Sequence, residues 1–531
     1  MNVTTLNMTT LDGNVIIKKG EGGGATINNQ DKVVDITENG TTEVVADNGF
    51  TGLSKVSVNV NVKGGGTSGA SPGAVTYYDY DGTVLHSFSA DAFAALAEHP
   101  ALPEREGLVC QGWNYDLAKA QEYVAKYGML NIGANYITDD GKTRLYIRIA
   151  AEGRMDVPLH FSQTVANGVT IDWGDGSETQ TVSGAGNKNI THKYASIGDY
   201  CITLSVANGC TLGLGHNSSS YCVIGSAGNN GKVYCNMLQT VEIGRNVTSF
   251  GAYAFNGCRS LASVVIPESV TNIDDGAFSY CNSLASVVIP ESVTNIDDGA
   301  FNYCNSLASV VIPESVTSIG NSAFSDCNSL ASVVIPESVT NIGAYAFNGC
   351  YSLASVVIPE SVTNIDDSAF SNCYSLASVV IPESVTNIGA YAFSYCYSLA
   401  SVVIPESVTN IDDGAFSGCR SLASVVIPES VTNIGAYVFS DCNSLASVVI
   451  PESVTNIDDG AFSDCYGMAF YDFSALTAMP SLSATNAFQS IPSDCKIIVP
   501  DALYDEWIAA TNWSTYASKI IKKSDWDTLN A

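Results

Sequence analysis

The sequence predicts a mainly β protein in which a solenoid of ten 23-residue repeats follows a two-layer β-sandwich and smaller β and α+β modules. Three observations lead to this fold class. One leucine-containing unit recurs between residues 236 and 467 without any change of period. Several segments before residue 210 alternate apolar and polar residues, as half-buried strands require. Only 14% of the 531 residues are charged while 46% are hydrophobic, which indicates a folded chain.

Residues 1–62 contain short alternating segments and are expected to form a small β module. The clearest strand face carries Val56, Val58, Val60 and Val62. The stretch DITENGTTEVVADNGFTGLSKVSVNVNV resembles a short repeat of phage tail proteins from gut bacteria, and this resemblance implies attachment to phage tail components. Residues 63–74, KGGGTSGASPGA, are predicted to be a linker, because glycine and serine without apolar partners cannot offset the entropy of ordering.

Residues 75–141 are predicted to form a small α+β module. Its aromatic β segment is VTYYDYDGTVLHSF, at residues 75–88, and the apolar spacing of LAKAQEYVAKY predicts an amphipathic helix from Leu117 to Tyr127. The sequence does not reveal which surface this module packs against.

Residues 142–210 contain three alternating segments separated by turn residues, the pattern of a β-sandwich. The segments are TRLYIRIAA, VTIDWGDGSETQTV and NITHKYASIGDYCITLSV. The residues that carry a resemblance to the polycystic-kidney-disease (PKD) domain are Asp172, Trp173, Gly174, Asp175, Gly176, His192, Tyr194, Gly198 and Tyr200. That resemblance implies an immunoglobulin-type sandwich that serves outside the cell as a spacer or binding module.

The repeat unit reads L-A-S-V-V-I-P-E-S-V-T-N-I-x-x-x-A-F-x-x-C-x-S. Leu261, Val264 and Ile266 have the spacing of an inward-facing strand, and a fixed period of this length is typical of a solenoid. The unit closely resembles the BspA-like leucine-rich repeat family, which implies adhesion. Residues 211–235 are expected to connect and cap the solenoid at 236–467, and residues 468–531 to cap its far end with Trp507 and Trp513 buried.

Outward positions of the predicted strands carry a row of valines from Val265 to Val449. Because monomers rarely expose large apolar patches, such a row predicts either a ligand-binding face or a β surface covered by a neighbouring chain, as in a homo-oligomer. The first copy has Glu242 in this position and Gly244-Arg245-Asn246 in place of Pro-Glu-Ser, which suits a polar cap.

The loop half of the repeat varies, whereas the strand half is nearly constant. The position before Cys is Gly, Tyr, Asp or Asn, and the position after Cys is Arg, Asn or Tyr. Recognition surfaces favour these residues, since tyrosine offers large amphipathic contact at low entropic cost. The pattern predicts a binding loop face, and the alternative is that turns tolerate these residues. The candidates are Arg259, Tyr280, Tyr303, Asp326, Tyr351, Tyr374, Tyr395, Tyr397, Arg420, Asp441 and Tyr466.

Eleven of the 16 cysteines stand in one register, from Cys235 to Cys465. Their spacing, without a nearby histidine, is wrong for zinc and predicts one small buried apolar residue per repeat. The paired aspartates are predicted to be turn carboxylates rather than calcium ligands, because most pairs do not fall in adjacent copies. These pairs are Asp274-Asp275, Asp297-Asp298, Asp366-Asp367, Asp412-Asp413 and Asp458-Asp459. We therefore expect no metal and no cofactor.

Several classes of function are disfavoured by what the sequence lacks. The net charge of -31 argues against nucleic-acid binding, which needs clustered Lys and Arg. All five histidines lie outside the repeats, and we find no catalytic motif, signal peptide, apolar span or anchor. An enzyme is not expected.

Two settings fit a non-enzymatic binding rod that contacts a cell-surface protein or glycan. The first is a phage or prophage tail component that recognises the bacterial surface, with its N-terminal modules attached to the particle. The second is a bacterial surface or secreted adhesin that binds host protein or glycan. A purely structural spacer is a further alternative. Each of the first two settings predicts an extracellular location, on a virion or at the bacterial surface.

Overall fold

The structure is a computed structural model, and its chain divides into two compact units, Met1–Pro72 and Gly73–Ala531. It describes strands within residues 14–60, and residues 75–529 apart from 80–82, 114, 128–129, 216–221 and 226–234. In the first unit, β1 (Asn14–Lys18) and β5 (Ser54–Val60) flank β4 (Gly40–Asp47), and β2 (Ala25–Asn28) pairs with β3 (Val33–Ile36). The predicted strand coincides with β5, while Val62 and the predicted linker lie outside the described residues.

The second unit opens with the α+β module, whose sheet has the order β7-β6-β9-β8. Its strands are β6 (Val75–Tyr78), β7 (Val84–Phe88), β8 (Leu108–Trp113) and β9 (Leu130–Thr138). Helix α1 spans Ala90–Ala94, and helix α2 spans Leu117–Tyr127, the residues predicted for it. Strands β6 and β9 run parallel, joined by a crossover that contains both helices. A strand pair that distant in sequence leaves no local signal, so the partner of β6 was not predicted.

The predicted sandwich has two antiparallel layers around one apolar core. One layer is β13-β12-β15-β10, formed by Gln180–Thr181, Val169–Asp172, Gly198–Val206 and Thr143–Ile149. The other is β14-β11-β16, formed by Gly186–Lys193, Asp156–Gln163 and Leu212–Leu214. Inside, the Trp173 ring stacks on His192 at 4.6 Å, and the Tyr194 hydroxyl donates to the Trp173 carbonyl at 2.8 Å. A short 3-10 turn, Glu152–Arg154, joins β10 to β11.

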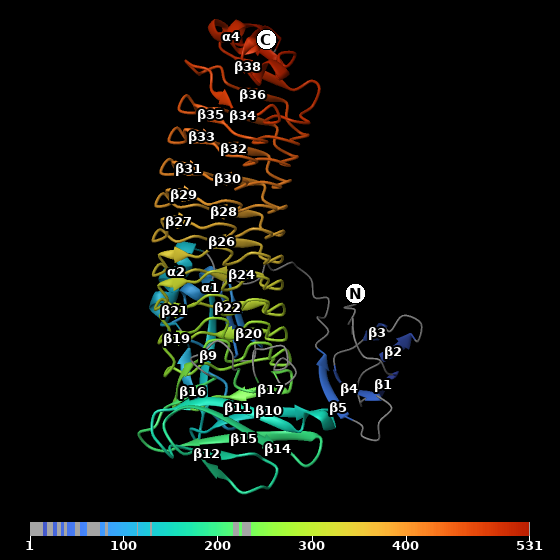
Figure 1. Cartoon of the computed structure of the whole chain (residues 1–531), viewed down its shortest axis with the longest axis vertical. Coiled ribbons are helices and arrows are strands. Elements are labelled where there is room, and N and C mark those ends of the chain that lie inside the picture. The colour runs from blue at the N-terminus through green and yellow to red at the C-terminus, as the bar shows by residue number, and fades with distance from the viewer. Residues whose placement is uncertain are drawn as a thin grey trace. The chain divides into compact units, whose positions relative to one another are not determined.

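Both sheets of the sandwich continue into the solenoid. Strand β17 (Leu238–Glu242) pairs with β10, and β18 (Val247–Phe250) pairs with β16. Glu242 was expected to lie in a polar cap that faces solvent. This prediction is wrong, because the Glu242 carboxylate accepts a hydrogen bond from the Tyr146 hydroxyl at 3.1 Å. The sandwich itself closes this end of the rod, and Figure 1 shows it at the base of the stacked rungs.

Each repeat makes one rung with two short parallel strands. Each row of strands forms one face of the rod and is divided between two hydrogen-bonded sheets, and we call the two rows the valine sheet and the isoleucine sheet. The valine sheet is formed by β20 (Ser286–Val288), β22 (Ser309–Val311), β24 (Ser332–Val334), β26 (Ser355–Val357), β28 (Ser378–Val380), β30 (Ser401–Val403), β32 (Ser424–Val426) and β34 (Ser447–Val449). The isoleucine sheet is formed by β19 (Asn272–Ile273), β21 (Asn295–Ile296), β23 (Ser318–Ile319), β25 (Asn341–Ile342), β27 (Asn364–Ile365), β29 (Asn387–Ile388), β31 (Asn410–Ile411), β33 (Asn433–Ile434) and β35 (Asn456–Ile457). The sequence predicted the strands of the valine sheet but not those of the isoleucine sheet.

The constant residues of the repeat hold the rungs together. Leu, Phe and Cys of each rung are buried, and phenylalanines of successive rungs stack, as Phe301 does on Phe324 at 5.3 Å. The constant serine also bonds back to the previous rung, since Ser292 Oγ donates to the Val270 carbonyl at 2.6 Å. The register cysteines are all buried and unpaired, which confirms their prediction as core residues.

The C-terminal segment covers the last rung. Strands β36 (Phe470–Asp472), β38 (Lys496–Val499) and β39 (Ile520–Lys522) extend the valine sheet beyond β34, and β37 (Ser481–Leu482) extends the isoleucine sheet. Around them lie α4 (Tyr504–Ala509), α5 (Lys523–Leu529) and the 3-10 turns Asp501–Leu503 and Trp513–Tyr516. Trp507 and Trp513 are fully buried, as predicted. The helices of the described part of the chain are all too short or too polar to cross a bilayer.

Candidate binding surface

The loop face consists of the turn that follows the isoleucine sheet in every rung. Its backbone is left-handed at two positions, which we call the first and second left-handed positions. Gly276 and Tyr280 occupy them in one rung, with φ of 57° and 58°. Glycine, asparagine and aspartate adopt this conformation most readily. The backbone conformation therefore explains why so few residue types occur before each cysteine. For Gly, Asn and Asp this supports the alternative that the turn merely tolerates them, but it does not explain Tyr.

Tyrosines at the second left-handed position pack onto the neighbouring rung. Tyr280 and Tyr303 stack with their ring centroids 4.6 Å apart. Tyr395 has no aromatic partner in the next rung and lies over Gly418 instead, where a Cβ atom would stand 2.6 Å from its ring. The Asp326 carboxylate beside Tyr303 raises the pKa of that phenol. Asp441, the last candidate at this position, is half-buried and stands apart from these tyrosines along the rod.

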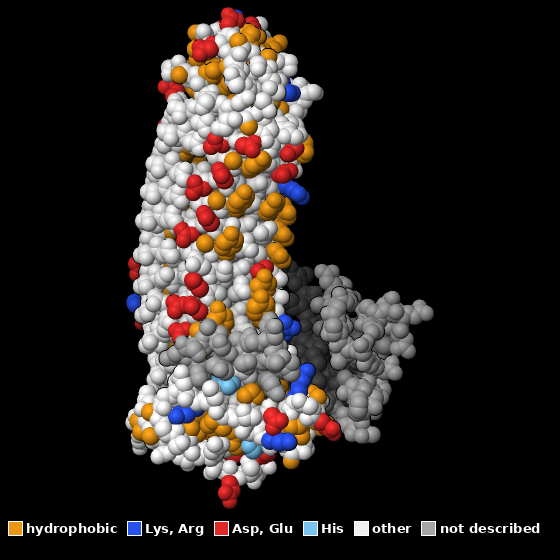
Figure 2. Space-filling view, viewed as in Figure 1, with side chains coloured by type: hydrophobic (Ala, Val, Ile, Leu, Met, Phe, Trp, Pro, Cys, Tyr) orange, Lys and Arg blue, Asp and Glu red, His pale blue; other side chains and the backbone are white. Residues whose placement is uncertain are grey.

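The post-cysteine position carries the largest continuous feature of the loop face. Tyr351, Tyr374 and Tyr397 stack in successive rungs with ring centroids 4.6 and 4.7 Å apart. The Arg420 guanidinium lies 4.6 Å from the Tyr397 ring centroid and extends the stack into a fourth rung. We call these four residues the tyrosine–arginine column. Figure 2 shows hydrophobic side chains, a class that includes tyrosine, in columns along the rod beside acidic ones.

The remaining predicted residues at the post-cysteine position do not join this column. Arg259 is exposed in the first rung, and Asn282, Asn305 and Asn328 separate it from Tyr351. Tyr466 is 59% exposed in the last rung and donates its hydroxyl to Asp464 at 3.0 Å. The structure therefore brings together four of the eleven candidates in one uninterrupted stack.

Sequence reasoning missed a second set of tyrosines, at the first left-handed position. Tyr345, Tyr391 and Tyr437 are 48%, 46% and 39% exposed there, and Tyr253 at the same position is half-buried. The signal was present as a Gly-Ala-Tyr triplet that alternates with Asp-Asp-Gly. The predicted candidates all stand directly before or after a cysteine, so this position was not among them.

The aspartate pairs hold turns together through hydrogen bonds. Asp298 Oδ1 accepts from the backbone amide of Asn321 in the next rung at 2.7 Å, and Asp413 Oδ1 accepts from that of Ala436 at 2.8 Å. Across the described residues, no three His, Cys, Asp or Glu side chains are grouped as metal ligands would be.

The valine sheet is covered over part of its length, so the predicted unbroken exposed row is wrong. Val311 is only 5% exposed, whereas Val380 is 65% exposed and Val403 is 75% exposed. The cause is the α+β module, whose Tyr115 and Tyr123 belong to one apolar cluster with Val311 and Val334. The sequence predicted either a ligand-binding face or a cover by a neighbouring chain. A cover by another part of the same chain was not predicted.

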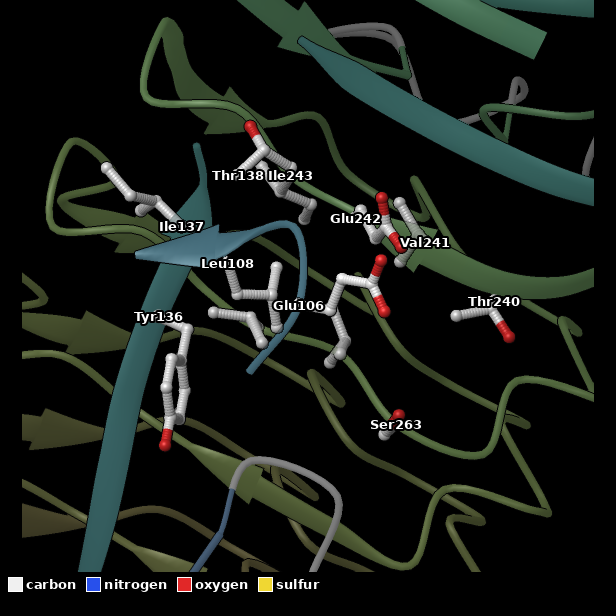
Figure 3. Close-up of a pocket in the computed structure, with 12 residues that line it drawn as sticks. Glu106, Leu108, Tyr136, Ile137, Thr138, Thr240, Val241, Glu242, Ile243 and Ser263 are labelled. Atoms are coloured by element: carbon white, nitrogen blue, oxygen red, sulfur yellow. The ribbon is translucent and has the colours of Figure 1, made fainter. Parts of the chain in front are cut away.

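A small cavity lies where the module meets the first rungs (Figure 3). Its volume is about 80 Å³, and its lining includes Glu106, Leu108, Tyr136, Glu242 and Val265. Pockets for small molecules usually span about 300–1,000 Å³. This cavity lies below that range, and the tyrosine–arginine column remains the candidate binding surface.

Comparisons with known proteins bear on the repeats. A family model described as the BspA type leucine rich repeat region matches residues 229–354 and 340–469. A leucine-rich cell surface protein of Faecalibacterium prausnitzii is 30% identical over 55% of this chain and 76% of its own, with a TM-score of 0.33. A leucine-rich repeat protein of Bacteroides ovatus is 26% identical over 53% and 88%, with a TM-score of 0.31.

A third solved structure, a leucine-rich repeat protein of T. pallidum, is 33% identical over 33% of this chain and 81% of its own, with a TM-score of 0.26. No curated protein matches the sequence. The family assignment depends on the repeat pattern, the rung geometry and the family model. Residues 229–469 of this chain form a BspA-type leucine-rich repeat region.

Proposed function

We propose that this chain is a non-enzymatic recognition or adhesion protein, and that its tyrosine–arginine column contacts the partner. The observation that carries the proposal is the stack of Tyr351, Tyr374, Tyr397 and Arg420 on an open face. Tyrosine and arginine are, with tryptophan, the side chains most enriched at the energetic centres of binding sites. Aromatic faces also suit the apolar faces of sugar rings, so the column fits a cell-surface protein or a glycan.

The column is held rigid by the core beneath it and by its own stacking. Its residues follow buried cysteines such as Cys373 and Cys396, whose positions are set by the core ladder. The stacking of neighbouring rings limits their rotamers before a partner arrives, which lowers the entropy that binding must offset. A rigid aromatic strip of this kind favours recognition over a purely structural role.

The proposed setting is the bacterial cell surface, because the BspA-type repeats resemble a family that is usual there. A phage or prophage tail is the second candidate, and the observation that favours it is the tail-like sequence around residues 35–62. Immunogold labelling of intact bacteria that carry the gene, and of phage particles induced from them, separates these settings. Label confined to particles contradicts the cell-surface proposal.

The binding test uses substitutions that the chain itself has adopted. Asn282, Asn305 and Asn328 occupy the post-cysteine position, so the triple variant Tyr351→Asn, Tyr374→Asn, Tyr397→Asn should fold normally. On a glycan array and on bacterial and host cells, we expect this full-length variant to bind about tenfold or more weakly. Tyr466→Asn, at an isolated tyrosine of the same position, is the matched control. Undiminished binding by the triple variant contradicts the proposal and favours the spacer alternative.

A further inference from the structure

We propose that the exposed upper half of the valine sheet docks a positively charged, tyrosine-bearing protein segment, in the way the lower half already docks the chain's own α+β module. This surface consists of Val380, Val403, Val426 and Val449 with the neighbouring glutamates, and we call it the valine–glutamate face. It is a different surface from the tyrosine–arginine column, so the two proposals stand or fall separately.

The covered half shows which contacts the sheet makes. The Tyr115 hydroxyl donates to the Ile312 carbonyl at 2.9 Å, and the Tyr123 hydroxyl donates to the Ile335 carbonyl at 3.1 Å. Their rings lie in the same apolar cluster as Val311 and Val334. Each tyrosine thus fills an apolar contact and satisfies the carbonyl that follows the strand in that rung.

Backbone contact is also close in the covered half. A Cβ atom at Gly133 of β9 would stand 2.3 Å from Cγ2 of Val288, so strand β9 approaches the sheet where it has no side chain. Figure 1 shows α2 and β9 of the module beside the first half of the rungs. The interface therefore ends partway along a sheet whose sequence does not change.

The same docking features recur above the module. Val380, Val403, Val426 and Val449 are 65%, 75%, 71% and 59% exposed, in four successive rungs. Their rungs repeat the S-V-V-I-P-E segment that receives Tyr115 and Tyr123 below. An apolar row that is buried in one half and exposed in the other is a typical protein-interaction site.

The glutamates of this face indicate the charge of the partner. Each rung carries a glutamate just after the strand. Above the module these glutamates are exposed, and they are Glu360, Glu383, Glu406, Glu429 and Glu452. In the covered half, Lys119 of α2 interacts electrostatically with the equivalent Glu291. A partner that carries lysine or arginine beside its tyrosines is therefore complementary to the face. A second copy of this chain is disfavoured, because its net charge is -31.

The test uses full-length protein and a fluorescent peptide derived from the module. The peptide copies residues 112–127 with Asp116→Lys and Glu122→Lys, and a comparison peptide instead carries Lys119→Glu and Lys126→Glu. In anisotropy titrations at low salt, we expect the cationic peptide to bind about tenfold or more tightly than the acidic one, with the difference shrinking as salt is added.

Two protein variants locate the peptide. The double variant Val403→Thr, Val426→Thr keeps β-branched residues in both strands and should weaken binding of the cationic peptide at least severalfold. Tyr466→Asn, at an isolated exposed tyrosine outside the valine–glutamate face, should leave that binding unchanged. Equal affinity for the two peptides, no binding of either, or no effect of the double variant overturns the proposal. Concentration-dependent self-association in sedimentation that the double variant abolishes also overturns it, in favour of a second copy.

A separate observation carries a second proposal at the start of the cysteine ladder. The Sγ atoms of Cys222 and Cys235 lie 2.8 Å apart, both fully buried, whereas the thiols of later rungs donate to phenylalanine carbonyls. We propose that these two cysteines form a disulfide outside the cell. Thiol–disulfide exchange with a small disulfide such as oxidised glutathione forms the S–S bond, and the two displaced thiols leave with the protons and electrons.

Alkylation of the oxidised full-length chain under denaturing conditions, followed by mass spectrometry, tests this pairing. We expect two fewer alkylated groups than the 16 cysteines, and one crosslinked peptide that joins Cys222 to Cys235. Cys258 touches Cys235 from the next rung and is the competing partner. Alkylation of all cysteines, or a crosslink between Cys235 and Cys258, overturns the proposal.

Discussion

The ring of Tyr391 lies across Gly414 of the next rung, where a Cβ atom would stand 2.4 Å from the tyrosine Cε1. The same relationship joins Tyr253 to Gly276 and Tyr437 to Gly460. It gives a physical reason for the alternation of Gly-Ala-Tyr and Asp-Asp-Gly turns, because a tyrosine in one rung needs a small residue in the rung that follows. Variation in the loop half is therefore coupled between neighbours.

We expect Gly414→Ala to destabilise the solenoid through its contact with Tyr391. The matched control is Gly299→Ala, since Gly299 has a similar φ of 61° but its nearest contact for a Cβ atom is 3.7 Å away. Left-handed backbone alone costs alanine about 1–2 kcal/mol, and this cost is common to both variants. Urea unfolding midpoints give the loss of stability in each variant. The additional loss in Gly414→Ala measures the cost of the contact with Tyr391. Equal midpoints contradict this account.

Gly133→Ala should release the α+β module from the valine sheet. The new methyl group would stand 2.3 Å from Cγ2 of Val288, so the strand or the valine side chain must shift. We expect faster hydrogen exchange in residues 75–138 and in the strands that hold Val311 and Val334, with the upper rungs unchanged. Gly153→Ala, where a Cβ atom meets nothing within 4 Å, is the control. Unaltered exchange in the mutant module contradicts this docking geometry.

The ionised Asp274 carboxylate should lower the free energy of unfolding at neutral pH. Burial and then the nearby Asp297 and Asp275 carboxylates raise the pKa of Asp274, although Asn272 donates to it. A raised pKa means that the folded state disfavours the ionised form, so the penalty appears as pH rises through the carboxyl range and vanishes at lower pH. Asp274→Asn should therefore raise the melting temperature at pH 7 and have little effect near pH 3. An equal rise in melting temperature at pH 7 and at pH 3 contradicts the electrostatic cause.

The ladder thiols should resist a disulfide reagent until the rungs open. Burial raises the pKa of Cys396 to about 12, so almost none of it is thiolate at pH 8. We expect Cys110 and Cys201, which are half-buried, to react first with Ellman's reagent, and the ladder to react only in denaturant. Rapid reaction of many thiols in the native protein contradicts a closed core.

The sequence predicted what depends on period and on local pattern. A 23-residue spacing with Leu, Phe and Cys at fixed places requires a stacked core, and the spacing of LAKAQEYVAKY was enough for α2. Docking of the module on Val311 was not predictable, because Tyr115 and Tyr123 meet the sheet across about 200 residues of chain and carry no period. The tyrosine–arginine column was only partly predictable: its residue types were visible, but their contact depended on rung-to-rung stacking.

The parallel pairing of rungs has a mechanical consequence. Backbone hydrogen bonds such as those between β22 and β24 run along the rod, so tension between its two ends loads the rungs in series rather than all at once. Each rung that gives way releases 23 residues, or roughly 80 Å of extended chain. Under a pull along its axis the rod would therefore lengthen in steps of one rung rather than yield all at once.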